Sequence, residues 1–301
     1  DQHLITEHVW PLLHKYKNKP QKTHGLWDSW GEEINIKLPP VTKQFNDSHK
    51  FVWLPIDKES ANNPWHVWID VISKFRLLER RGTTHFTKYI YIMSNPSKYF
   101  DKVAKELFPT LKYYVMPKGE VWRFQHLIVP SMSNHNDGVT TPHLAPWLRH
   151  FKGLFGYKKL KPNRKIFVSR ENSKTRKLVN AEELLMMLKG WEIVKLEEMS
   201  IKEQFKTFAE ATHVLATHGA GLVNLLWCNK GTKVIEIQDP KMLHKKVYPL
   251  LSHHLGLKHE VYLAETIPIG TSEGKKPAGV KRLNDLINFE INIPDLIRLL
   301  D

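Results

Sequence analysis

A histidine and two closely spaced glycines stand where a predicted strand runs into a predicted helix, in the segment THGAGLVN from Thr217 to Asn224. The N-terminus of a helix presents backbone N–H groups without acceptors and a positive dipole end, which together suit a phosphate group. Gly219 and Gly221 would let the backbone approach a ligand, and His218 could donate to a phosphate oxygen. A simple glycine turn would have the same sequence. The spacing is not that of a dinucleotide fingerprint, and no Walker lysine follows the glycines.

A basic loop follows the predicted strand that ends at Ser169, and it supplies Arg170 and Arg176. Between Lys158 and Lys177 the chain has nine basic residues and one acid. An arginine side chain binds phosphate through two parallel hydrogen bonds, so we interpret these two arginines as candidate phosphate ligands. For the flanking lysines we favour a solvated basic surface.

A carboxylate stands near the end of another predicted strand, KVIEI at residues 233–237. Parallel strands end at one edge of their sheet, so Glu236 would lie near the glycine turn and the basic loop. A carboxylate at this edge could accept hydrogen bonds from ribose hydroxyls. An acid exposed to water at the end of a strand fits the sequence equally well.

The segment NNPWHVWID in the first half of the chain places His66 and Asp70 four residues apart, on one face of a predicted helix. An apolar stripe marks a different face of the same helix and contains Trp68, Val71, Ile72, Phe75 and Leu78. A histidine and a carboxylate that face solvent or a cleft could remove the proton of a hydroxyl group. On geometry alone, an ordinary surface pair is the interpretation that we prefer.

Regular α/β elements are expected to position these residues. In the second half, strands at 165–169, 191–196, 213–217 and 233–237 alternate with helices, which is typical of a parallel sheet. Asn180 with Glu183 and Ser200 with Glu203 have the spacing of helix capping boxes. The first half contains predicted strands at 51–56, 89–93, 111–116 and 121–129, and predicted helices at 64–81, 96–107 and 142–155.

We expect two domains, residues 1–156 and 157–282, because the segment GYKKLKPN at 156–163 combines glycine, proline and several lysines. A strand at 289–293 and a helix from Pro294 end the chain. No internal repeat of fixed period is present.

The composition is globular, with 41% hydrophobic and 25% charged residues among 301, and the formal charge is +14. This charge favours an anionic partner. The only cysteine, Cys228, excludes an intrachain disulfide and a zinc site built from several thiolates. The 17 histidines include no HExxH motif, so we expect no metal. No apolar stretch is long enough to cross a membrane, and a chain that starts at Asp1 carries no information on any segment before it.

Taken together and in this order, the sequence features resemble those of the family-61 glycosyltransferases, an inverting family that includes xylosyl- and N-acetylglucosaminyltransferases. The resemblance covers about residues 60–240 and is more specific in the second half. The matching positions are His66, Trp68 and Asp70; Ser169, Arg170 and Arg176; Asn180 to Glu183; His218 to Leu222 and Asn224; and Gly231, Val234, Glu236 and Ile237.

The resemblance implies a GT-B fold, in which two Rossmann-like domains face each other across a cleft. It also implies a UDP-sugar donor bound by the second domain, no cofactor and no essential metal. The last helix, within residues 283–301, would pack back on the first domain. Asp70 would be the catalytic base, with His66 as helper or alternative. The donor site would contain Ser169, Arg170, Arg176, His218, Gly219, Ala220, Gly221, Leu222 and Glu236.

The same resemblance suggests UDP-xylose as the donor, with UDP-N-acetylglucosamine as the alternative, and a hydroxyl of a glycan or glycoprotein as the acceptor. Lumenal members carry several cysteines. This chain has one, so we expect a bacterial or viral enzyme in the cytoplasm, the host cytoplasm if viral. No integral membrane segment is expected, peripheral contact is left open, and the sequence does not indicate an oligomeric state.

Two rival readings remain at this point. The first is a basic nucleic-acid-binding α/β protein, although the sequence has no RRM, KH or helix-turn-helix signature. The second is a glycan-binding module without catalysis.

Overall fold

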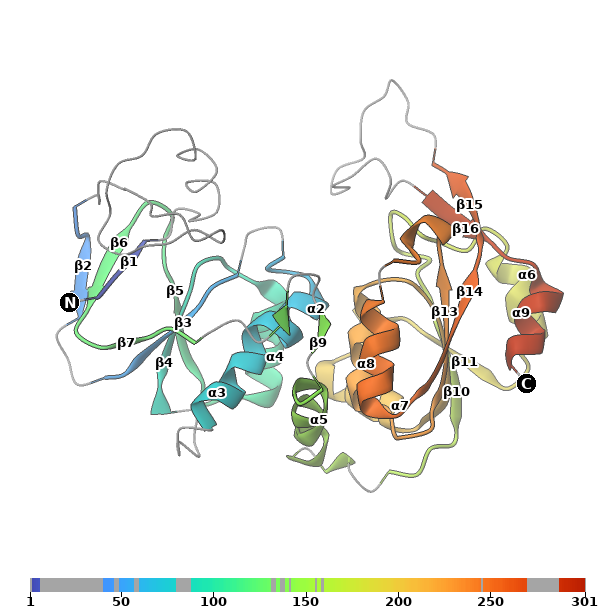
Figure 1. The fold of residues 1–301 in the computed structure, drawn as a ribbon, viewed down its shortest axis with the longest axis horizontal. Coiled ribbons are helices and arrows are strands. Elements are labelled where there is room, and N and C mark those ends of the chain that lie inside the picture. The colour runs from blue at the N-terminus through green and yellow to red at the C-terminus, as the bar shows by residue number, and fades with distance from the viewer. Residues whose placement is uncertain are drawn as a thin grey trace. The chain divides into compact units, whose positions relative to one another are not determined.

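The computed structural model divides into two compact units, residues 1–132 and 133–301, and each is described by itself (Figure 1). Both units contain a parallel sheet with helices, so the predicted α/β class is confirmed. The structure describes residues 2–5, 40–45, 49–56, 60–79, 88–130, 134–135, 139–140, 142–154, 156–157, 160–244, 246–269 and 287–300.

The main sheet of the first unit has four parallel strands in the order β5-β4-β3-β7. These are β3 (Phe51–Leu54), β4 (Ile90–Met93), β5 (Lys112–Val115) and β7 (Leu127–Ile128). The strands β3 and β4 are apolar on both faces and largely buried, as expected for a parallel sheet covered on both sides. The strand predicted at 121–129 is in fact two strands, because residues 125–126 separate β7 from β6 (Val121–Phe124).

A second sheet in this unit has the order β1-β6-β2, with β1 (Gln2–Ile5) antiparallel and β2 (Lys43–Phe45) parallel to β6. Aromatic side chains join it to the main sheet. The ring of Phe45 stacks on Phe124, with ring centroids 4.9 Å apart, and both rings contact Phe51 on β3.

The predicted helix 64–81 is a run of four short helical segments. It comprises α2 (Pro64–His66), the π-helix η1 (Val67–Val71), the 3-10 helix η2 (Ile72–Lys74) and α3 (Phe75–Glu79). Every residue of the predicted apolar stripe is buried, as expected, but Lys74 on the face of His66 and Asp70 is buried too. The helix α4 (Lys98–Leu107) begins at Ser97, whose side chain accepts from the N–H of Phe100 at 3.0 Å.

The second unit is built on five parallel strands in the order β11-β10-β12-β13-β14 (Figure 1). They are β10 (Arg164–Val168), β11 (Trp191–Val194), β12 (Ala211–Thr217), β13 (Lys233–Gln238) and β14 (Lys258–Leu263). The predicted parallel sheet is confirmed, and β14 is an additional strand. The helical elements are α6 (Ala181–Met187), η5 (Leu196–Glu198), α7 (Ile201–Ala209), η6 (Ala220–Trp227), η7 (Pro240–Met242) and α8 (Val247–Leu255).

Two short antiparallel pairs complete this unit: β8 (Asn134–His135) with β9 (Val139–Thr140), and β15 (Glu265–Pro268) with β16 (Ile287–Glu290). The capping box predicted at Ser200 is confirmed, since the side chains of Ser200 and Glu203 each accept from the other residue's N–H. The box predicted at Asn180 is not formed. The Asn180 amide instead hydrogen-bonds to the backbone of Ile291, at 2.8 Å to its oxygen, and so ties α6 to the end of the chain.

The helix α5 (Leu144–Leu154) belongs to the second unit, which therefore begins at residue 133 and not at the expected position 157. Arg149 donates to the carbonyl of Leu255 at 2.7 Å and so caps the C-terminus of α8. Lys152 is buried and donates to the side chain of Asn229 at 2.7 Å. The predicted linker 156–163 thus lies inside a unit, because α5 packs on η6 and α8, which follow it in the sequence.

The last helix, α9 (Ile293–Leu300), also packs on the second unit. Leu296 and Leu300 share a buried cluster with Phe167 of β10 and Leu184 of α6, and α6 and α9 lie side by side in Figure 1. We expected this helix to pack on the first unit, and the described contacts differ from that expectation. The cause is the apolar face of α9, which closes the core beneath α6.

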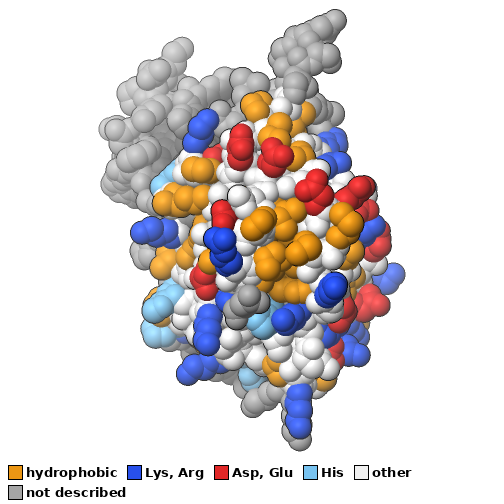
Figure 2. Space-filling model, turned by 90° about the vertical axis from the view of Figure 1, so that its right-hand side faces the viewer, with side chains coloured by type: hydrophobic (Ala, Val, Ile, Leu, Met, Phe, Trp, Pro, Cys, Tyr) orange, Lys and Arg blue, Asp and Glu red, His pale blue; other side chains and the backbone are white. Residues whose placement is uncertain are grey.

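The face that carries α6 and α9 has apolar side chains gathered at its centre, with acidic and basic groups around them (Figure 2). Met186 and Met187 of α6 are 70% and 58% exposed.

Candidate functional site

The glycine turn lies at the carboxyl end of β12, the middle strand of the five-stranded sheet in the second unit. His218 follows the strand and donates its backbone N–H to the carbonyl of Ile237 on β13, at 2.8 Å. Gly219 is extended and begins η6, a 3-10 helix where the sequence predicted an α-helix. The N–H of Leu222 donates to the carbonyl of Gly219 at 3.0 Å, so this N–H is used inside the helix. Leu222 is also buried, and we remove it from the expected ligand N–H groups.

Arg170 packs directly against the glycine turn. A Cβ atom built on Gly219 would clash with Nη1 of Arg170 and lie 3.3 Å from its Cζ, so the absence of a side chain at 219 makes room for this guanidinium. Nη2 of Arg170 donates a long hydrogen bond of 3.4 Å to the carbonyl of Thr175. Its Nε is buried and has no partner among the described residues. The predicted convergence of the basic loop and the glycine turn is therefore present.

Arg176 reaches the same turn from the other end of the basic loop. Its Nη1 donates to the carbonyl of His218 at 3.1 Å, and its buried Nε has no partner among the described residues. The backbone of Arg176 has a φ of 60°, a left-handed conformation that residues with a side chain rarely adopt. The hydrogen bond from its N–H to the carbonyl of Ile287, at 2.6 Å, holds the residue there.

The two guanidinium groups form a half-buried pair of positive charges, and the Nε atom of each is buried. Burial lowers the pKa of Arg170 to about 10, and the charge of Arg176 acts in the same direction. Neither arginine makes an ion pair with a described residue. Like charges held close together out of water are costly, and an anion between them removes that cost. The arrangement is therefore suited to a group with two or more negative charges.

Ser169 lies at the start of the same loop but serves the turn itself. Its Oγ accepts from the N–H of Glu171 at 3.2 Å, and its own N–H donates to the carbonyl of Val194 on β11 at 2.9 Å. These bonds fix the direction in which the chain enters the loop, so the structure gives Ser169 a supporting position next to Arg170.

Glu236 is fully buried between two histidines. This position differs from the one expected for a residue that binds ribose. His218 Nδ1 hydrogen-bonds to one of its oxygens, and His259 Nε2 lies 3.0 Å from the other. Burial raises the pKa of Glu236, but the hydrogen bonds and charges of the two histidines outweigh burial and leave the pKa below its ordinary value. Because each oxygen of Glu236 already has a histidine partner and the residue has no exposed surface, the structure gives a ribose hydroxyl no access to it.

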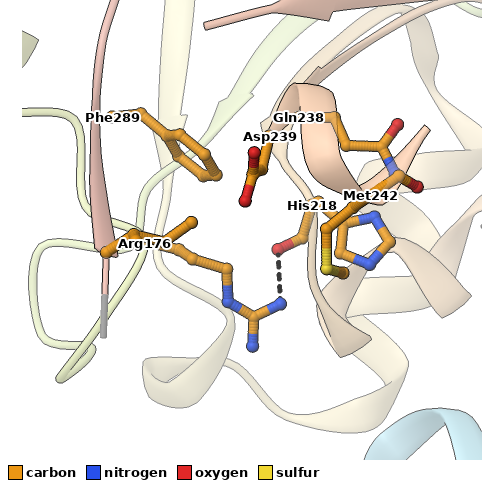
Figure 3. A pocket seen from close by; sticks show the side chains of 7 residues that line it. Arg176, His218, Gln238, Asp239, Met242 and Phe289 are labelled. Carbon is orange, nitrogen blue, oxygen red and sulfur yellow. Dashed lines mark hydrogen bonds between the residues drawn. The ribbon is translucent and has the colours of Figure 1, made fainter. Parts of the chain in front are cut away.

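A small pocket opens beside Arg176 and His218 (Figure 3). The Arg176 guanidinium, the Asp239 carboxylate and the Phe289 ring all lie around it in the close-up view. Asp239 directly follows β13 and is 6% exposed, and one of its oxygens accepts from the N–H of Lys241 at 2.9 Å. Gln238, Met242 and Ile287 complete the lining. Our sequence reasoning missed Asp239, although it stands at the predicted strand edge.

In the first unit, His66 and Asp70 form the expected pair. His66 Nδ1 lies 2.6 Å from Oδ2 of Asp70, and the two side chains are 35% and 18% exposed. Asp70 lies in the π-helical turn η1, where the N–H of Ile72 reaches the carbonyls of both Val67 and Trp68. Single π-helical turns are frequent at functional sites, because the extra residue re-aims the side chains around it.

Lys74 lies one turn beyond Asp70, and sequence reasoning missed it. Its side chain is buried, and its Nζ has no partner among the described residues. Burial lowers the pKa of Lys74 to about 8, although the charge of Asp70 acts in the opposite direction. The spacing of four residues from Asp70 was the signal that could have indicated it.

Two properties hold for the described part of the chain as a whole. No group of three or more histidine, cysteine, aspartate and glutamate side chains there is placed to hold a metal ion. No helix there has the length and the apolar character needed to cross a membrane.

Comparison with known proteins decides the family. The model of the family Glycosyltransferase 61 matches residues 3–235 of the 301. The chain belongs to the glycosyltransferase 61 family. Membership indicates a glycosyltransferase, an enzyme that moves a sugar from a donor to a glycan acceptor. The matched residues include every site residue expected from the sequence except Glu236, which lies one residue beyond the match.

This family-61 glycosyltransferase is also similar to a plant protein, Beta-1,2-xylosyltransferase RCN11 of Oryza sativa subsp. japonica, with 30% identity over 128 residues. The similar segment covers 39% of this chain and 21% of the plant protein. The match thus spans about a fifth of that relative's length. The 30% identity within it supports a distant relationship to a xylosyltransferase.

Proposed function

We propose that this chain is an inverting glycosyltransferase that uses a UDP-sugar donor. One observation carries the donor site: the guanidinium groups of Arg170 and Arg176 converge on the glycine turn. The buried Nε–H of each arginine has no hydrogen-bond acceptor among the described residues. Thr217 adds a third buried donor, since its Oγ1 also lacks a partner among the described residues. Buried donors of this kind are normally satisfied, so a missing acceptor indicates a ligand.

A diphosphate has the charge and the acceptors that these donors need. Its oxygens would accept from the two arginines and from the N–H groups of Gly219, Ala220 and Gly221, which the 3-10 helix leaves without an acceptor. In transfer the diphosphate is the leaving group, so these positive charges would stabilise it most when the bond to the sugar breaks. The proposal therefore needs no essential metal and no other cofactor.

The pocket beside Arg176 supports a place for the nucleoside. The edge of the buried Phe289 ring lines this pocket, and Asp239, which is 6% exposed, offers a carboxylate oxygen for ribose hydroxyls. We assign to Asp239 the role that the sequence had suggested for Glu236, because both residues lie at the end of β13 and only Asp239 lines the pocket.

For catalysis we propose Asp70 as the base, with His66 holding it in place. Asp70 would remove the proton of an acceptor hydroxyl. The hydroxyl oxygen would then attack the anomeric carbon from the side opposite the departing diphosphate, which inverts the configuration. The two parallel sheets support a GT-B arrangement, in which donor and acceptor meet between two Rossmann-like domains.

The plant relative's name makes UDP-xylose the first candidate donor, with UDP-N-acetylglucosamine second, and a hydroxyl of a glycan or glycoprotein the acceptor. We further propose a bacterial or viral enzyme of the cytoplasm, the host cytoplasm if viral. The single cysteine, which is buried, supports this proposal, because the fold then has no need of an oxidising compartment.

A panel of ligands tests the class of activity. We expect UDP at about 100 times its Kd to stabilise the chain by about 2.7 kcal/mol and to raise its Tm by roughly 4–8 °C. One UDP-sugar of the panel should also be hydrolysed or transferred. Tm shifts with oligonucleotides and none with UDP would contradict the proposal and favour nucleic-acid binding, which the charge of +14 alone would also permit.

The close contact at Gly219 gives a second test. In Gly219→Ala the new methyl group should push the Arg170 guanidinium away from the turn, so we expect UDP affinity to fall on the order of 10-fold, since a hydrogen bond to a charged group contributes about 1.5–3 kcal/mol. Calorimetric titration with UDP measures the change. Gly190→Ala is the control for the general effect of replacing a glycine. A Cβ atom at Gly190 would contact no other residue, while the φ of 76° makes the substitution strained. Equal UDP affinity in both variants would argue against a ligand at the turn.

A further inference from the structure

Four side chains next to the glycine turn form a continuous hydrogen-bond network: Ser252, His259, Glu236 and His218. Ser252 Oγ lies 2.7 Å from Nδ1 of His259, whose Nε2 lies 3.0 Å from one oxygen of Glu236. The other oxygen of Glu236 bonds to Nδ1 of His218. Ser252 and Glu236 are fully buried, and the His259 side chain is 5% exposed.

The carboxylate of Glu236 fixes the direction of its two hydrogen bonds. The lowered pKa of Glu236 keeps it as a carboxylate, which can only accept. Therefore Nδ1 of His218 and Nε2 of His259 must each carry a proton. The Ser252 hydroxyl can donate to or accept from His259 Nδ1, so both ring nitrogens of His259 have a partner in either case. Only Nε2 of His218 is left without a described partner.

A phosphate oxygen also only accepts. His218 lines the pocket beside Arg176, and its Nδ1 proton is already committed to Glu236. To bond to a phosphate oxygen, Nε2 must therefore carry a second proton, which makes the ring an imidazolium. The buried carboxylate of Glu236 lies against the same ring and balances that charge.

We propose that binding of the nucleoside diphosphate draws one proton from solvent onto Nε2 of His218, and that Glu236 is the positioning residue that makes this uptake favourable. The inference rests on the donor site proposed above. When the sugar leaves, the same proton lies beside the new charge of the diphosphate, and it returns to solvent when the product is released.

Other ionisable groups lie near His218, and proton uptake by them must be distinguished from proton uptake by His218. Tyr248 of α8 lies with its ring centroid 5.2 Å away, and burial raises its pKa, so it stays neutral. Arg170 and Arg176 are already cations. Asp239 of the pocket and His259 of β14 are the two remaining groups that could take up a proton.

The decisive measurement is the titration of the whole chain with UDP at pH 8 in buffers of different ionisation enthalpy. Free UDP is fully ionised there, since the second phosphate pKa is about 6. We expect uptake approaching one proton per UDP bound, and an affinity that falls by up to about 10-fold per pH unit above pH 8. UDP binding with no proton uptake would overturn the inference and leave the donor site intact. No UDP binding would overturn both.

Variants assign the proton. His218→Gln keeps a neutral donor near the position of Nε2, so we expect UDP still to bind but without proton uptake. Uptake that persists in this variant belongs to Asp239 or His259 and overturns the assignment. Glu236→Gln should cut the uptake by more than half and weaken UDP binding roughly 10-fold at pH 8. Glu260→Gln, the same change at an exposed site on β14, is the matched control and should behave as the wild type.

Discussion

Replacing Arg170 by alanine is expected to lower UDP affinity by about 10²–10⁴-fold, enough to abolish measurable binding. The expected loss combines two charge-assisted hydrogen bonds to phosphate, at about 1.5–3 kcal/mol each. Folding should survive the change, because burial and the nearby charge of Arg176 both make the charged guanidinium of Arg170 unfavourable in the free protein. Calorimetric titration with UDP, with the Tm of the free variant beside it, measures both effects.

Arg298→Ala is the matched control for this variant. Arg298 lies on α9 with its side chain 79% exposed and contacts Asp295 at 3.1 Å, so its loss should change neither UDP binding nor Tm appreciably. Near-normal UDP affinity in Arg170→Ala would remove the donor site from the basic loop. The glycine turn would then be a structural turn only.

Asp70→Asn is expected to keep UDP binding within about twofold and to reduce sugar transfer by about 10²–10⁴-fold, the range that a general base contributes. The asparagine oxygen can still accept from Nδ1 of His66, so the geometry of the pair should persist while the base is lost. Initial transfer rates with the donor found in the ligand panel, measured against UDP affinity, separate the two effects.

Asp101→Asn makes the same change at a carboxylate of the first unit that accepts from the Tyr113 hydroxyl at 2.8 Å, and its transfer rate should stay at the wild-type level. Normal transfer by Asp70→Asn would place the base elsewhere. The next candidates would be His135, Asp137 and His143. The side chains of His135 and Asp137 lie outside the described residues, and His143 is exposed.

The sequence predicted the second unit well because its strands carry strong local signals. Runs such as KIFVS and KVIEI are apolar on both faces, which only a covered parallel sheet satisfies, and the loops at their carboxyl ends then had to meet. The convergence of Arg170 with Gly219 follows from this topology alone. Glu236 could not be assigned in the same way, because its two histidine partners come from positions 18 residues before it and 23 residues after it.

The errors in the first half and at the boundary have a different physical origin. The helix of Asp70 was expected to be regular, but its π-helical turn depends on how Trp68 and its neighbours pack beneath the sheet. Residues 156–163 have the composition of a linker, and composition reports flexibility of a segment but not which side of it a helix packs on. Lys74 was missed, because a lysine is rarely buried and its burial here depends on tertiary packing.

The position of α5 decides where the polypeptide can be cut. A fragment that starts at residue 157 would lack Arg149 and Lys152, so it would leave the last carbonyl of α8 and the amide of Asn229 without their partners. It would also expose to water the apolar faces of α8 and η6 that α5 now covers. An autonomous version of the donor-binding half must therefore begin near residue 133, some twenty residues before the sequence looks like a linker.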